Sequence, residues 1–215
     1  MNSWYCIVLL QLTTTLALGQ LVPQTKSAMV AGEPAAIVRS LYRVVVARHP
    51  IGLPWGADRK ALAPYLSKDL IRKLDAAQAC GADYSRHHPD PNEKPQIEWL
   101  ELGLFSGANE NALPAAFHVE NVYPEKDGSF RVHLRLTYRD SYETYGRPPT
   151  EANTFRWYVD VIVVREDGHF AVDNVIYLKD EGDPRDVEPP LSQVLTIGCD
   201  GSRWVGYGDE RNDSK

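Results

Sequence analysis

The chain has 215 residues, and its 43% apolar and 24% charged residues are typical of a globular protein with one substantial core. Its formal net charge is -6. Proteins that bind nucleic acid without sequence preference need a basic surface, so this charge argues against that class of partner.

Residues 1–19 have the pattern of a secretory signal peptide. Residues 6–18 are uncharged and largely apolar, and Ala17-Leu18-Gly19 has the small-x-small pattern of a signal-peptidase site. No lysine or arginine precedes the run, so an uncleaved anchor or a different start codon is the alternative. The run is too short and too rich in threonine to span a bilayer well. We expect export to the periplasm or the extracellular space, with no membrane attachment after cleavage.

Residues 20–33 are interpreted as a flexible lead-in, residues 34–206 as a single α+β domain and residues 207–215 as a disordered tail. Pro34 suits the first turn of a helix that ends at His49-Pro50. Its apolar residues recur at helical spacing: Ile37, Val38, Leu41, Tyr42, Val45 and Val46.

A short helix is expected between Asp58 and Tyr65. Ser67 then has the position of an N-cap for a second long helix. Gly81 is expected to end this helix, which makes residues 83–95 a polar loop. Residues 97–105 fit a short strand or a helical turn equally well.

Two hairpins follow, each marked by an Asp-Gly pair that suits a two-residue type I′ turn. The first joins residues 117–123 to residues 130–139, with Val119 opposite Leu136, Asn121 opposite Leu134 and Glu120 opposite Arg135. The second occupies residues 155–178, with Val163 opposite Val172, Val161 opposite Asn174 and Val159 opposite Ile176. Each hairpin then has one apolar and one polar face.

The two faces carry different candidate residues. The apolar face includes two amides, Asn121 and Asn174, which either orient a ligand in a pocket or bond to loop backbone. It also includes three aromatic side chains that either line a pocket or belong to the core: Tyr123, Tyr138 and Trp157. The polar face carries the candidates for surface interaction: Glu120, Arg131, His133, Arg135 and Arg139. These residues form an anion or partner site, or an ordinary solvated or subunit-contact face neutralised by Glu120, Asp160 and Asp173.

Residues 191–197 suit one or two helical turns, and Cys199 follows in a glycine-flanked turn. Without residues 1–19 the chain has two cysteines, which in an exported protein favours a disulfide over two free thiols. The chain after Leu178 is long enough for Cys199 to return to the helical layer, where Cys80 lies. We expect a Cys80–Cys199 bond that docks Trp204 against the helices, with the Cα atoms about 4.4–6.8 Å apart.

Helices followed by about four antiparallel strands predict an α+β fold, in which the N-terminal helices pack on the apolar face of the sheet. Tyr65-Leu66-Ser67 before Leu70, the two hairpins, and Leu191-Ser192 leading to Cys199-Asp200-Gly201 and Trp204-Val205-Gly206 resemble the nuclear transport factor 2-like superfamily. Within it, the chain is similar to exported bacterial domains of unknown function. The resemblance implies a cone-shaped, curved sheet with a pocket between sheet and helices.

No motif for a cofactor or a metal stands out. His87 and His88 are adjacent and would point apart, and no second pair at ligand spacing exists. Enzymes of this superfamily, such as ketosteroid isomerases and dehydratases, place Asp or His inside the cone, whereas the predicted apolar face has neither within the hairpins. The residues that could reach the pocket from elsewhere are Glu98, Glu101, Asp58 and His49.

The leading prediction is therefore an exported, non-enzymatic binding or protein-interaction domain. Its partner is a second copy of the chain or an envelope protein, bound through the polar sheet face. The alternative is a small-molecule isomerase or dehydratase. A solvent-reached interior that holds a carboxylate or a histidine would favour the enzyme, and a filled interior would favour the binding domain.

Overall fold

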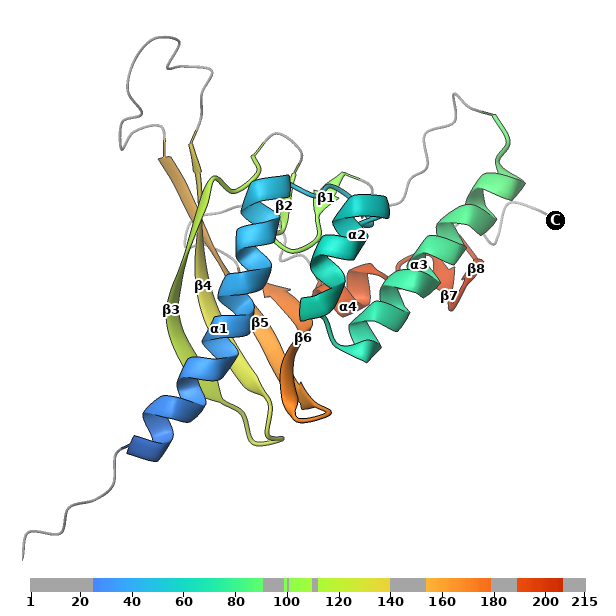
Figure 1. The fold of residues 1–215 in the computed structure, drawn as a ribbon. Coiled ribbons are helices and arrows are strands. Elements are labelled where there is room, and N and C mark those ends of the chain that lie inside the picture. Colours follow the sequence, from blue (N-terminus) through green and yellow to red (C-terminus); the bar gives the residue numbers. More distant parts are fainter. Residues whose placement is uncertain are drawn as a thin grey trace, which may run out of the picture.

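The computed structural model describes residues 25–90, 99, 101–109, 112–139, 154–178 and 189–206. Predictions for residues 1–19, 207–215 and Glu98 lie outside this part of the chain. The fold is α+β, as predicted: helices come first, and a four-stranded antiparallel sheet curves around the first of them (Figure 1). The strand order is β3-β4-β5-β6, formed by Ala116–Pro124, Phe130–Arg139, Thr154–Glu166 and His169–Tyr177.

The first helix, α1, spans Thr25–Arg48 and lies along the inner face of the sheet. The prediction that Pro34 occupies its first turn is wrong, because the helix begins nine residues earlier and contains Pro34 in its interior. A proline removes one hydrogen bond from a helix but does not forbid the turns before it. The predicted apolar stripe is confirmed in its main positions, since Val38, Leu41, Tyr42 and Val45 are buried.

Helices α2 and α3 follow, with a short 3-10 turn, η1, between them, and α3 packs at the β6 edge of the sheet (Figure 1). Helix α2 spans Gly56–Leu62, η1 spans Ala63–Tyr65 and α3 spans Lys68–His87. Ser67 is the N-cap of α3, as predicted, and its Oγ accepts a hydrogen bond from the Leu70 N–H at 2.9 Å.

The prediction that Gly81 ends α3 is wrong, because the helix continues for six more residues. A Cβ atom at Gly81 would lie 3.0 Å from the ring of Trp99. The glycine therefore permits a close approach of the indole to the helix. The expected polar loop accordingly starts only after His87.

The hairpin of β5 and β6 has the predicted turn, with φ values of 47° at Asp167 and 81° at Gly168. Val163 lies opposite Val172, as predicted, but the register shifts beyond this pair. Asp173 is an extra residue in β6, so Val161 lies opposite Val175 and Val159 opposite Tyr177. The predicted pairings of Val161 with Asn174 and of Val159 with Ile176 are therefore wrong.

The hairpin of β3 and β4 departs further from the prediction. Its turn has five residues instead of two, and the Glu125 N–H closes it by donating to the Ser129 carbonyl at 2.9 Å. Phe117 lies opposite Leu136 and Val119 opposite Leu134, and a bulge at Glu120 then places Asn121 opposite His133. Asn121 and Tyr123 consequently lie on the outer face of the sheet, not on the predicted apolar face.

Short elements complete the fold. A small hairpin of β1 (Leu102–Gly103) and β2 (Ala108–Asn109) precedes the sheet. Helix α4 (Leu191–Val194) follows the sheet, and β7 (Cys199–Asp200) pairs with β8 (Arg203–Trp204) beside α3 (Figure 1).

Candidate functional site

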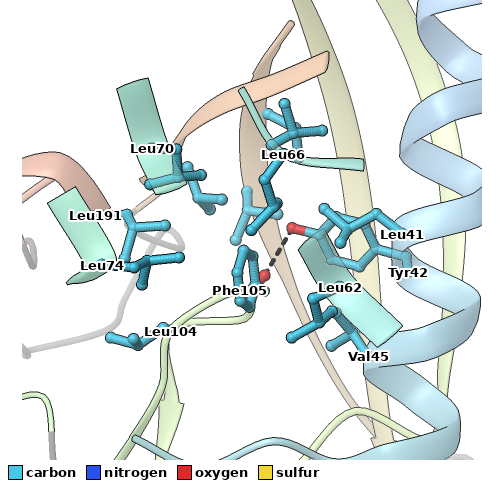
Figure 2. Close-up of a cluster of buried hydrophobic side chains, with 14 of the residues drawn as sticks. Leu41, Tyr42, Val45, Leu62, Leu66, Leu70, Leu74, Leu104, Phe105 and Leu191 are labelled. Atoms are coloured by element: carbon cyan, nitrogen blue, oxygen red, sulfur yellow. Dashed lines mark hydrogen bonds between the residues drawn. The ribbon is translucent and has the colours of Figure 1, made fainter. Parts of the chain in front are cut away.

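The space between the helices and the sheet is filled by side chains (Figure 2). Leu104 and Phe105, in the turn between β1 and β2, are each 1% exposed and lie among leucines from α2 and α3. Leucines and valines of α1, β4 and β5 close the cluster from the other side. The described interior is thus a packed core.

The polar groups of this interior hold the β1–β2 turn in place. The Tyr42 hydroxyl donates to the Phe105 carbonyl at 2.6 Å, and the Tyr177 hydroxyl donates to the Leu104 carbonyl at 2.6 Å. The Trp157 indole N–H donates to the Ser106 carbonyl at 2.7 Å. Burial raises the pKa of Tyr42 well above its usual value, so its phenol remains a donor. These three aromatic side chains therefore hold the backbone of the β1–β2 turn inside the domain.

The five residues predicted as pocket candidates do not come together. Trp157 reaches the interior turn, whereas Tyr138 stacks on Phe155 near the end of the sheet, with ring centroids 6.2 Å apart. Asn174 docks α4, because its Oδ1 accepts the Ser192 N–H at 2.9 Å. Asn121 and Tyr123 lie on the outer face, where both are exposed.

Of the residues that could have reached the interior from elsewhere, Asp58, Glu101 and His49 are described, and all three lie outside it. Asp58 forms an ion pair with Arg48 at 2.6 Å, and Glu101 is exposed. His49 is exposed and contacts the Pro114 carbonyl at 3.2 Å. Within the described part of the chain, the interior therefore presents no carboxylate or imidazole.

The outer face of the sheet carries a row of three acid–base pairs along β4. Arg131 Nε lies 2.8 Å from Glu125, His133 Nδ1 lies 2.8 Å from Asp160, and Arg135 Nε lies 3.0 Å from Glu120. The predicted link between Glu120 and Arg135 is thus present as an ion pair, although the residue opposite Arg135 is His118. We call these six residues the outer-face row. Each base has a carboxylate beside it, so the row is not an unneutralised anion site.

Two other predicted members of this face lie apart from the row. Arg139 is exposed at the end of β4. Asp173, expected to neutralise the bases, instead accepts a hydrogen bond from the Ser67 hydroxyl at 2.6 Å. The β6 bulge turns this carboxylate toward the start of α3.

His133 is at the centre of the outer-face row and is held on two sides. Asp160 beneath it is only 7% exposed, and the Tyr158 ring stacks on the imidazole with centroids 5.0 Å apart. A carboxylate accepts hydrogen bonds, so this contact assigns the donor role to the His133 Nδ1. None of the described residues bonds to Nε2. It is therefore available to a hydrogen-bonding partner.

Beside the row is an open depression of about 560 Å³. Its walls are the β3–β4 turn and Arg131, and its apolar part is formed by Ile162 and Ile176. Arg131 also lies over the Tyr123 ring at 5.8 Å. Neither isoleucine was predicted to belong to a site, because only the bulge in β6 places Ile176 beside Ile162 on the outer face. The spacing of two residues between Asp160 and Ile162 on β5 was the signal in the sequence that could have placed Ile162 on the outer face.

The adjacent histidines His87 and His88 are engaged locally. His87 Nδ1 lies 2.9 Å from the Asp83 carbonyl, one helical turn away, and His88 stacks on Tyr84. No group of three metal-ligating side chains gathers anywhere in the described ranges. None of the described helices is both long and apolar enough to cross a bilayer.

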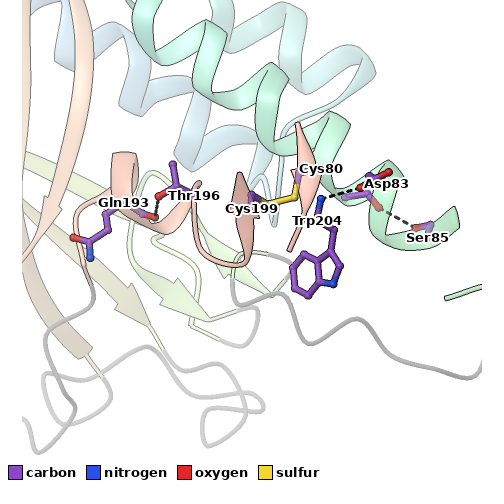
Figure 3. The surroundings of a disulfide bond; sticks show 8 residues. Cys80, Asp83, Ser85, Gln193, Thr196, Cys199 and Trp204 are labelled. Carbon is purple, nitrogen blue, oxygen red and sulfur yellow. Dashed lines mark hydrogen bonds between the residues drawn. A yellow bond between two sulfur atoms is a disulfide. The ribbon is translucent and has the colours of Figure 1, made fainter. Parts of the chain in front are cut away.

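The predicted disulfide is confirmed. Cys80 of α3 is bonded to Cys199 of β7, with the Cα atoms 6.0 Å apart (Figure 3). The expected docking of Trp204 is also present. Its backbone N–H donates to Asp83 Oδ2 at 2.9 Å, and its ring meets the Tyr84 ring edge to face.

Fold and site together define an α+β protein with a packed interior, an open polar sheet face and a disulfide between α3 and the C-terminal hairpin. The sequence matches no protein-family model and no curated protein. Its structure is similar to the crystal structure of a protein of unknown function from Bacteroides thetaiotaomicron, with a TM-score of 0.33 and 19% identity. The match covers 70% of this chain and 93% of the other.

Proposed function

We propose that the protein is an exported, non-enzymatic interaction domain of the nuclear transport factor 2-like type. It binds a second copy of itself or an envelope protein through the outer face of the sheet. The observation that carries this proposal is the contrast between the two sides of the sheet. The inner side is packed and its aromatic donors are engaged, whereas the outer side presents hydrogen-bonding groups, half-buried isoleucines and an open depression.

The outer-face row also indicates the chemistry of the partner surface. Its Arg and Glu side chains neutralise each other, so a strongly charged partner would gain little here. A surface of mixed charge with an apolar side chain for the depression and a hydroxyl or amide for His133 fits better. The disulfide is compatible with an oxidising compartment, which supports the export part of the proposal.

The substitution Arg135→Glu tests this function. It removes the pair with Glu120 and places two carboxylates side by side on the outer face. We expect self-association, measured by sedimentation, or capture of an envelope partner to fall at least about tenfold, because like charges meet where a pair existed. Thermal stability should change little, since the site is partly exposed. Arg43→Glu, the same charge change on the exposed side of α1, is the matched control.

Two outcomes would contradict the proposal. If Arg135→Glu lowers the free energy of unfolding by several kcal/mol while association stays unchanged, the row serves the fold. If Arg43→Glu reduces association as much as Arg135→Glu does, net charge governs association and the outer face has no specific role.

A further inference from the structure

The C-terminal segment, residues 198–206, lies beside the second half of α3 (Figure 3). We call these residues the strap. A disulfide joins Cys199 to Cys80, and the backbone N–H of Trp204 donates a hydrogen bond to Asp83. The Trp204 ring also packs against Tyr84, with centroids 4.9 Å apart. The strap is therefore attached to one helix through one short stretch of that helix.

The strap is a compact hairpin in its own right. Gly198 has a φ of 72°, and a Cβ atom there would lie 2.4 Å from the Trp204 ring, so the indole folds directly over this glycine. The Val205 N–H donates to the Gly198 carbonyl at 2.9 Å, and Cys199 pairs with Trp204 across the hairpin. Such a unit is able to move as one piece about its start.

The chain just before the strap is anchored independently of the disulfide. Leu191 and Val194 of α4 are fully buried in the main core. Asn174 of β6 holds Ser192 by two hydrogen bonds, of 2.9 and 3.0 Å. Loss of the disulfide would therefore leave α4 in place, and movement would begin near Gly198.

The two sulfur-bearing residues differ in access. Cys80 is completely buried, whereas Cys199 is partly exposed. A thiolate from solution would meet the Cys199 sulfur first, and access is one of the properties that make a disulfide reducible.

We propose that the Cys80–Cys199 bond is a redox latch, which a dithiol reductant opens to release the strap from α3 while the sheet and α4 remain folded. One thiolate of the reductant attacks Cys199 Sγ and forms a mixed disulfide, and the electron pair of the broken bond goes to the Cys80 sulfur. The second thiol of the reductant then closes the reductant's own disulfide and releases the Cys199 thiolate. Two electrons pass from the dithiol to the protein, and both cysteines take up protons as needed.

The open form differs from the closed form at a defined place. The Asp83 carboxylate loses the Trp204 N–H, and the Tyr84 ring loses its contact with the indole. The second half of α3 then presents an acid and a phenol ring that the strap had engaged. The latch thus gives the domain two surfaces at this end, selected by the redox state of its surroundings. This surface is separate from the outer face of the sheet, so the latch does not depend on the proposed function.

The test is a comparison of the oxidised protein with the protein in dithiothreitol by ¹H–¹⁵N NMR. We expect the backbone signals of residues 200–205 and the Trp204 indole signal to move to random-coil positions on reduction. The signals of β4, β5 and residues 191–194 should keep their dispersed positions. The double substitution Cys80→Ser with Cys199→Ser should reproduce the reduced spectrum without any reductant. If this variant does not fold, the spectrum of the reduced wild-type protein decides whether the strap is released.

Two results would overturn the latch. If the strap signals stay in place after reduction, Trp204 and Asp83 hold the strap without the bond. If the sheet signals collapse together with the strap signals, the disulfide holds the whole fold together and does not control a local opening.

Discussion

At the scale of single residues, the hydroxyls of Tyr42 and Tyr177 determine how the interior is closed. Both donate to carbonyls of the same turn, which fills the space that the resemblance to cone-shaped proteins assigned to a pocket. The burial of Tyr42 was predictable from its place in the helical stripe. The burial of Tyr177 was not, because an extra residue in β6 reverses the face on which it lies.

We predict that Tyr42→Phe lowers the free energy of unfolding by about 1–2 kcal/mol. The variant keeps the ring but leaves the buried Phe105 carbonyl without this donor. Equilibrium unfolding in urea measures the change. Tyr123→Phe is the control, because Tyr123 is 44% exposed and its loss should cost less than about 0.5 kcal/mol. Equal effects of the two substitutions would contradict the anchoring role of Tyr42.

At the scale of elements, the sequence predicted the existence of both hairpins and the β5–β6 turn but not the pairing of every strand. Alternating residues identify a strand, and Asp-Gly identifies a turn, from local sequence alone. A bulge depends on what the sheet packs against. Asp173 is the unpaired residue of β6, at the point where its carboxylate accepts from Ser67 at the start of α3. The five-residue turn after β3 is stabilised separately, by Asp127 accepting from the Ser129 N–H. The two bulges account for the misplaced Asn121, Tyr123 and Asn174.

We predict that Ser67→Ala loosens the attachment of α3 to β6 and costs about 1–2 kcal/mol of unfolding free energy. Ser67 Oγ accepts the Leu70 N–H and donates to Asp173, and the residue is fully buried. The matched control is Ser85→Ala in the same helix, where the hydroxyl is exposed. We expect that control to be neutral or slightly stabilising, since alanine favours helix. A neutral Ser67→Ala would show that the cap is dispensable.

Acid should weaken the contact between α3 and the strap. The Trp204 N–H, and then the Arg86 side chain, hold the pKa of Asp83 below its usual value. A lowered pKa means that the folded protein favours the ionised acid, so this stabilisation is complete above about pH 5 and is lost as the pH falls through the pKa of the folded state. Oxidised wild-type protein should therefore lose more stability between pH 7 and pH 3 than Asp83→Asn does, measured by urea unfolding. Equal losses would exclude this contribution of Asp83.

At the scale of the whole molecule, the order of helices and strands was sufficient to predict the layers, and cysteine counting together with chain reach was sufficient to predict the disulfide. The filled interior could not be predicted in this way. Leu104 and Phe105 come from a stretch whose local pattern fitted a strand or a helical turn equally well. Their place inside the fold is determined by side chains from distant elements, Tyr42 and Tyr177.

The expected export of the protein predicts where its mature chain begins in the native host. If residues 1–19 are a signal peptide, the protein secreted by the native host begins near Gln20. Intact-mass measurement of that protein tests the cleavage. A mass that retains Met1 to Gly19 would contradict it.

The disulfide has a topological consequence as well. Its two cysteines are 119 positions apart, and all four strands of the main sheet lie between them, so the sheet belongs to a covalent ring. A protease that cuts one peptide bond anywhere in this ring turns it into an open chain but releases no fragment. The nicked protein remains a single covalent particle until it meets a reductant, at which point only noncovalent contacts hold its two chains together.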